Sequence, residues 1–249
     1  MNFCKKLMVC FLTVLLLVTA CFSAFALEYP CEGVANASSV RVRKKASTSG
    51  AQLTTLKKGE AVTVLEETIK ENGDVWYKIE TAKGKTGYVL SDYLSVPEKE
   101  LIEAAEKSSK GVKMQLKITA SCKDYNSVGK NWTHYYEWNG IKVEDGKMEA
   151  FVAPGVDLAV YARVREQDQK PETTTEKTYY TPTAEEVKKG FTVTQKIKVT
   201  ENAGRFSGNS ATWTITYTFS PVKNKAGGIY AAHPMAIFIL YCFTGTQVA

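Results

Sequence analysis

Histidine and cysteine are scarce beyond the first 26 residues, which limits the metal and nucleophilic chemistry available to the chain. The histidines there are His134 and His233, whereas a catalytic zinc commonly takes three protein ligands, often histidines. Cys122 lies eleven residues before His134, but it should end a strand, and a cysteine peptidase needs its nucleophile within reach of a base. These few histidines and cysteines therefore argue against a zinc enzyme and against a cysteine peptidase.

Carboxylates are the remaining candidates for catalysis. Glu166 and Asp168 share one face at the end of an expected strand, while Glu137 and Glu201 lie near aromatic segments. Two of them at the right separation would suit glycoside hydrolysis. Glu166 and Asp168 also offer oxygens to calcium, but the spaced acidic loop of a recognisable calcium site is absent. We expect no catalytic residue, metal or cofactor, and keep a carboxylate-dependent hydrolase as an alternative.

The densest aromatic stretch, residues 132–138, is typical of a surface that binds a ligand. In an extended strand, alternate side chains point to opposite faces, so one face belongs to the core. The other face carries Tyr135 beside Glu137. An aromatic ring next to an acid suits a sugar or a peptide, and we take both residues as ligand-binding candidates.

Composition places these groups in a globular protein. The chain has 249 residues, of which 44% are hydrophobic and 23% charged, as expected for one or two domains. Its formal net charge of +6 falls to +4 without Lys5 and Lys6. This balance does not match a nucleic-acid-binding protein, which needs a concentrated positive face.

Residues 1–26 have the pattern of a helical secretory signal peptide. Two lysines precede an apolar run at residues 7–18, and a small-residue stretch ends at Ala26. The run is shorter than the about 20 apolar residues of a transmembrane helix. We expect cleavage before Leu27, a secreted chain and no stable transmembrane anchor. A lipoprotein acylated at Cys21 is the alternative, because residues 18–21 resemble a lipobox.

Cleavage would leave three cysteines, Cys31, Cys122 and Cys242. An odd number without close spacing excludes a metal knuckle. Export permits disulfides, and Cys31 with Cys122 is the only pair that we consider. Small half-buried thiols are the alternative.

Residues 27–96 predict a small β-barrel. Short segments alternate between apolar and polar residues and are separated by glycine-containing turns. Five such strands can bury an adequate core only by closing on themselves. The aromatic residues most suited to a shallow binding surface, of which at most two should be exposed, are Trp76, Tyr77, Tyr88 and Tyr93.

Four ordered motifs make this block resemble a bacterial SH3 domain. They are Ser39-Val40-Arg41-Val42-Arg43, Leu56-Lys57-Lys58-Gly59, Trp76-Tyr77-Lys78-Ile79, and Gly84-Lys85-Thr86-Gly87-Tyr88-Val89 with Tyr93-Leu94. The basic stretch Lys44-Lys45-Ala46 departs from the usual turn of the family. The resemblance implies a secreted barrel that binds cell-wall peptidoglycan or its peptides.

Residues 97–111 predict a short helical linker with a thin apolar stripe that rests on a neighbouring domain. Ser95, with Glu98 three residues later, matches a capping box at its start.

Residues 112–222 predict an antiparallel, immunoglobulin-like β-sandwich. Long alternating segments begin at Met114, Leu158, Phe191 and Ala211. Between the second and third of these, residues 183–190 match a short helix with a capping box and a glycine stop. The block is similar to β-sandwich regions of exported proteins of Gram-positive bacteria, which implies only export and fold.

Residues 223–249 end in a continuous apolar run, residues 235–243, that is too short to span a bilayer as a helix. We expect little order in this tail. The chain as a whole predicts an all-β, non-catalytic, secreted protein of the cell envelope. Its barrel would bind wall material, and its sandwich would contact a second ligand or an extracellular protein. A cell-wall hydrolase and a secreted protein-binding or inhibitory module are the alternatives.

Overall fold

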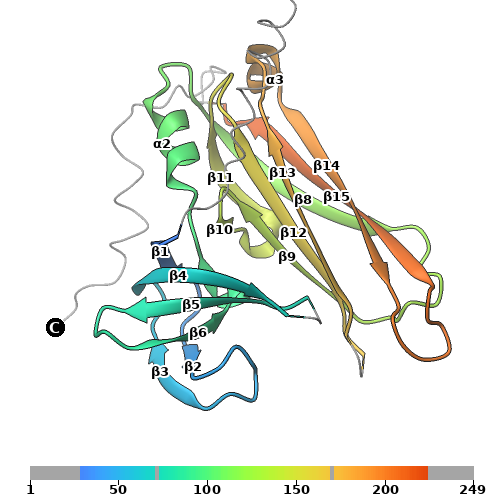
Figure 1. Ribbon diagram of the computed structural model, residues 1–249. Helices are drawn as coiled ribbons and strands as arrows, with labels where there is room; N and C mark the ends of the chain where they lie inside the picture. Colours follow the sequence, from blue (N-terminus) through green and yellow to red (C-terminus); the bar gives the residue numbers. More distant parts are fainter. Residues whose placement is uncertain (1–28, 71–72, 169–170, 224–249) are drawn as a thin grey trace, which may run out of the picture.

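The computed structural model describes residues 29–70, 73–168 and 171–223. The expected signal peptide and nearly all of the apolar tail lie outside the described residues. Within these ranges strands dominate and helices are short, which confirms the all-β fold class (Figure 1). None of the described helices is long and apolar enough to cross a membrane.

Seven strands, two more than the sequence predicts, build the first unit as one strongly curved antiparallel sheet with the order β3-β2-β6-β5-β4-β1-β7. They are β1 (Cys31–Ala35), β2 (Val40–Arg43), β3 (Gln52–Leu56), β4 (Ala61–Ile69), β5 (Val75–Thr81), β6 (Thr86–Leu90) and β7 (Leu94–Ser95). Alternation explains the core, since Val40 and Val42 are buried while Arg41 between them is exposed. A single-turn 3-10 helix, η2 (Ser91–Tyr93), joins β6 to β7.

Helix α2 (Lys99–Lys107) connects the two units and begins later than the sequence predicts. Its N-cap is Glu98, without a side-chain cap, so the capping box expected at Ser95 is wrong. Ser95 belongs instead to β7, where its buried hydroxyl accepts a bond from the backbone of Lys142. The apolar side of α2 lies against the second unit, with Ala105 packed in one cluster with Phe151.

Two four-stranded antiparallel sheets form the second unit, with the orders β10-β9-β12-β13 and β11-β8-β15-β14. The strands are β8 (Val112–Cys122), β9 (Trp132–Trp138), β10 (Ile141–Lys142), β11 (Lys147–Val152), β12 (Leu158–Glu166), β13 (Thr173–Tyr180), β14 (Phe191–Thr200) and β15 (Ser210–Pro221). The apolar faces of both sheets meet in one core that includes Leu116, Val160 and Tyr217. This is the two-sheet sandwich that the long alternating segments predict.

One side of the sandwich is closed by a buried amide. The Gln195 side chain donates to the carbonyls of Val160 and Glu176 in the opposite sheet and accepts from the Tyr217 hydroxyl. Helix α3 (Ala184–Lys189) lies at one end of the same side and has the predicted capping box, in which Thr183 and Glu186 exchange hydrogen bonds. Edge strands β13 and β14 are thereby joined.

Backbone bonds hold the barrel against the sandwich. The turn between β9 and β10 accepts from the linker, through Gly140 from Val96 and through Asn139 from Glu98. Gly140 has a φ of +73°, and a Cβ there would lie 1.9 Å from the Val96 carbonyl oxygen. Only glycine therefore permits this approach of the two chains.

Buried charge reinforces the same junction. The Arg163 guanidinium, on β12, forms an ion pair with Asp92 and donates to the Ser91 hydroxyl of η2 at 3.2 Å. Lys177 of β13 pairs with Glu98 at 3.0 Å. The buried cations Arg163 and Lys177 thus have partners from the other side of the junction.

Candidate functional site

The four barrel aromatics predicted as a binding surface have different environments. Trp76 and Tyr77 are 2% and 8% exposed, so both belong to the interior rather than to a recognition surface. Tyr88 is half-buried, and Tyr93 is 46% exposed. Tyr93 is thus the member of this set that offers a ring to a ligand.

Tyr135 and Glu137 lie in the junction, because the barrel covers the face of β9 that carries them. Tyr135 is 7% exposed, its hydroxyl donates to Glu137 at 2.9 Å, and the Arg163 guanidinium lies 4.8 Å from its ring centre. The interpretation of Tyr135 as an open ligand contact is therefore wrong, since the sequence does not reveal what covers this face. Burial raises the pKa of Glu137 to about 7.

The opposite face of β9 places a row of aromatic side chains between the two sheets. His134 meets the edge of the Trp213 ring at 4.3 Å, Trp132 lies 5.3 Å from the same ring, and Tyr136 contacts Tyr217. Trp132, His134 and Tyr136 are only half-buried although they face the interior. The sandwich is therefore open beside them.

The opening exists because the edge strands on this side, β10 and β11, are short and belong to different sheets. β10 pairs with β9 only at Trp138 and Glu137, and the chain then crosses through η3 (Glu144–Gly146) to β11 in the other sheet. β11 reaches β8 only as far as Lys117. Among the described residues, the edges of β9 at 132–135 and of β8 at 118–122 consequently have no partner strand on this side.

The direction of the free backbone groups follows from the register. The Tyr136 carbonyl accepts from Val143 on the open side, whereas Asn131 and Asn139 bond toward the β12 side. Residues two apart in a strand point their backbone groups to the same edge. The N–H and C=O groups of His134 and Trp132 therefore face the opening, where they can pair with an added strand.

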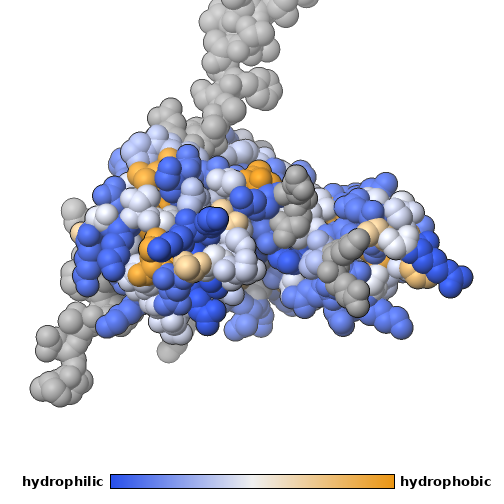
Figure 2. All heavy atoms as spheres, turned by 60° about the horizontal axis from the view of Figure 1, so that its bottom comes forward, coloured by the Kyte–Doolittle hydropathy of each residue, from blue (hydrophilic) through white to orange (hydrophobic). Residues whose placement is uncertain are grey.

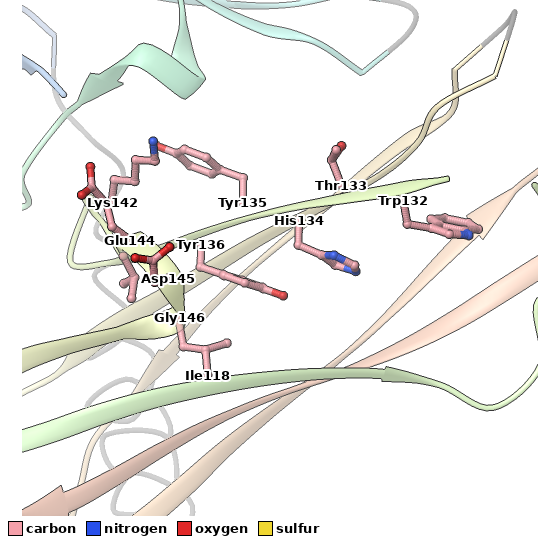
Figure 3. A pocket seen from close by; sticks show the side chains of 11 residues that line it. Ile118, Trp132, Thr133, His134, Tyr135, Tyr136, Lys142, Glu144, Asp145 and Gly146 are labelled. Carbon is pink, nitrogen blue, oxygen red and sulfur yellow. The ribbon is translucent and has the colours of Figure 1, made fainter. Parts of the chain in front are cut away.

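A groove of about 720 Å³ follows this open side (Figure 3). His134 and Tyr136 extend from β9 toward Ile118 of β8, and together they form the floor. Asp145 lies at one end of this floor. Lys142 extends over the opposite face of β9, with its Nζ 5.9 Å from the centre of the Tyr135 ring, and Glu144 pairs with Lys58 of the barrel at 3.7 Å. The groove thus combines a free strand edge, an aromatic floor and a charged end.

A second hollow of about 240 Å³ adjoins the groove across β9 and reaches the barrel. Asp92 and Tyr93 of η2 line it together with Arg163 and Arg165. Both hollows share Thr133 to Tyr135 and Lys142. The exposed ring of Tyr93 consequently stands beside a surface that continues along β9.

The face of the molecule drawn in Figure 2 is largely hydrophilic, and its apolar side chains lie in small separate patches. Exposed large apolar or aromatic side chains are scattered among both units: Ile69, Tyr93, Tyr125, Tyr179 and Phe206. The face drawn in Figure 2 therefore offers no broad apolar patch for docking.

The environments of Cys31, Cys122 and His134 do not favour nucleophilic chemistry. Cys31 and Cys122 are both free thiols, so the disulfide considered from the sequence is not formed. The Cys122 thiol donates to the Asp124 carbonyl at 3.2 Å, and burial raises its pKa. Burial also lowers the pKa of His134, which faces the Trp213 ring. A thiol and a neutral imidazole suit packing and polar contacts better than nucleophilic attack.

Carboxylates gather at another place, the end of the sandwich opposite α3. One oxygen each from Glu166, Asp168 and Glu172 lies within 4.8 Å of the others. Sequence analysis singled out Glu166, Asp168 and Glu201 but missed Glu172. A signal was present, since Glu172 comes directly before a strand that pairs with the one ending at Glu166. Glu137 lies apart from this cluster, in the junction.

Comparison with known families supports the assignment of the barrel. Residues 38–95 match the family model of the bacterial SH3 domain. No curated protein matches the chain in a sequence search. The barrel is thus a bacterial SH3 domain, which indicates a module that binds cell-wall material or peptides.

Proposed function

We propose that this chain is a secreted, non-catalytic binding protein of the bacterial cell envelope. Its SH3 domain attaches to peptidoglycan or to the peptides of peptidoglycan, and its sandwich holds an extended peptide in the groove beside β9. The observation that carries the proposal is the match of residues 38–95 to the bacterial SH3 family. The leader at residues 1–26 supports export, with acylation at Cys21 as the alternative route to the envelope.

The groove supports binding of an extended peptide in particular. Outward backbone groups at His134 and Trp132 can form ladder hydrogen bonds with an added strand, which supply affinity, while side-chain pockets give specificity. The aromatic floor favours alternate apolar side chains of the peptide. Exposed Asp145 at the charged end can hold a polar group or a positive charge of the ligand.

Retention on purified peptidoglycan tests attachment through the SH3 domain. We expect Tyr93→Ala to weaken retention by about 10-fold, because an exposed tyrosine at a binding centre is a typical hot spot. Phe206→Ala is the matched control, since Phe206 is 45% exposed compared with 46% for Tyr93 but lies in the β14–β15 connection, outside both hollows. If the unaltered chain is not retained at low or moderate salt, wall attachment is wrong.

Strand addition is tested separately by adding soluble muropeptides to the protein and measuring its tryptophan fluorescence, because Trp132 lines the groove. His134→Pro removes one outward N–H but none of the bonds to β12, and proline is tolerated on strand edges. His134→Ala keeps the N–H and removes the ring. Stronger loss with proline than with alanine supports strand addition, whereas equal effects contradict it. Release of product from labelled muropeptides would contradict the non-catalytic assignment.

A further inference from the structure

Three connections meet at the end of the sandwich opposite α3 (Figure 1). They are residues 123–131 between β8 and β9, the described residues 167, 168, 171 and 172 between β12 and β13, and residues 201–209 between β14 and β15. Hydrogen bonds tie them together, since the Gln167 amide donates to the Asn131 carbonyl and the Asn202 amide donates to the Glu172 carboxylate. The side chains carried there are consequently held close to one another.

Buried carboxylates occupy the space between these connections. Glu166, Glu172 and Glu201 are 1%, 6% and 7% exposed. Glu172 accepts from the Asn202 amide through one oxygen. Its second oxygen Oε2, and Oε2 of Glu166, are buried and have no hydrogen-bond partner among the described residues. A buried charge without a partner is costly, so these two oxygens require a proton or a cation.

No described cation meets this need. None of the salt bridges between described residues involves Glu166, Glu172 or Glu201. Burial and the neighbouring acids raise the pKa of Glu166 and of Glu172, as mutual repulsion requires. Exposed Asp168 borders the same space and opens it to solvent.

The backbone leaves room for the most buried of these groups. Gly129 has a φ of +44°, and a Cβ there would lie 1.7 Å from Oε1 of Glu166. Any other residue at this position would displace the carboxylate. The β8–β9 connection therefore permits an acid to lie where an apolar side chain would be less costly.

We propose that Glu166, Asp168 and Glu172 bind a calcium ion, with Glu201 at the margin of the site. An all-oxygen set selects a hard cation rather than zinc. Oxygens bound to one calcium at 2.3–2.6 Å lie at most about 5 Å apart, which the 4.8 Å cluster satisfies. Magnesium needs shorter bonds and near-ideal octahedral geometry, so it fits this set of three carboxylates less well.

Calorimetry and thermal unfolding of the chelator-treated full chain test this site. Calcium chloride about tenfold above a Kd of about 0.1–1 mM, the range of extracellular calcium modules, should raise Tm by about 3–6 °C. Magnesium should have a smaller effect. Glu166→Gln should abolish the calcium shift, and Glu185→Gln in α3 is the control that should leave it unchanged.

Two outcomes would overturn the proposal. If calcium leaves Tm unchanged and Glu166→Gln raises it, the carboxylates share protons instead of a cation. If calcium has no effect and Lys170→Gln lowers Tm, an ammonium group compensates them; Lys170 lies in the same connection, outside the described residues. Should Glu166→Gln fail to fold, Asp168→Asn replaces it, because an exposed position tolerates the change and should still lose calcium affinity.

Discussion

The junction and the carboxylate cluster bury charge in opposite ways. At the junction, the Arg163 guanidinium lies against Asp92, Ser91 and the Tyr135 ring, and Lys177 meets Glu98. At the cluster, Glu166 and Glu172 are buried, and each has one carboxylate oxygen without a hydrogen-bond partner among the described residues. Described residues therefore compensate Arg163 and Lys177 at the junction, whereas the second region is where we propose a calcium ion.

The largest effect should come from removing the acid of the junction. Asp92→Asn leaves the guanidinium of Arg163 buried without its counter-charge, which should lower the free energy of unfolding by about 3 kcal/mol. Urea unfolding measures this difference. In Arg163→Met the remaining Asp92 is partly exposed and can be solvated, so the loss should be smaller. Equal losses in both variants would break the contrast, because they would imply that packing, not charge, dominates there.

A smaller effect should follow from pH at Glu137, the one acid of the junction with a raised pKa of about 7. An unfolded glutamate titrates near 4.3, so between these values the folded chain binds the extra proton. Stability should therefore fall as pH rises from about 4.5 to 7, by on the order of 2 kcal/mol. Glu137→Gln should flatten that part of the urea-unfolding pH profile.

Glu166 and Glu172 also have raised pKa values. Without a bound cation they should therefore also make the free energy of unfolding decrease as pH rises. Calcium should remove their contribution and leave that of Glu137. This separates the two regions in one experiment. A profile that does not respond to calcium in the wild-type chain would remove the distinction.

The smallest effect should come from the exposed ion pair between the linker helix and the barrel. Lys99 lies 2.7 Å from Glu32, and both side chains are almost half exposed. Glu32→Gln should change the free energy of unfolding by less than about 1 kcal/mol, and salt should remove the difference. A loss as large as that of Asp92→Asn would mean that exposure does not distinguish these pairs.

Local sequence patterns predicted much of the fold. Alternation identified the strands that contain Met114 and Phe191, and the barrel motifs identified the SH3 domain. The capping box at Thr183 was also correct, because its partners are three residues apart. Such features depend on neighbours along the chain, which a sequence displays directly.

Features made by distant residues could not be predicted in this way. Ser95 has the spacing of a helix cap, but pairing with β1 places it in a strand. Tyr135 has the pattern of an exposed strand residue until the barrel covers it. Glu172 joins Glu166 only because β12 and β13 pair. The groove likewise depends on where β10 and β11 stop, a length that no local pattern encodes.

The two bonds from the linker to the β9–β10 turn have a mechanical consequence. Because Val96 and Glu98 donate to Gly140 and Asn139, the connection has no slack and cannot act as a swivel. Torque or tension applied to the barrel therefore passes directly into the sandwich. If the barrel is bound to a surface, the orientation of the groove relative to that surface is therefore fixed as well. The two domains act as one rigid unit and not as independently moving modules.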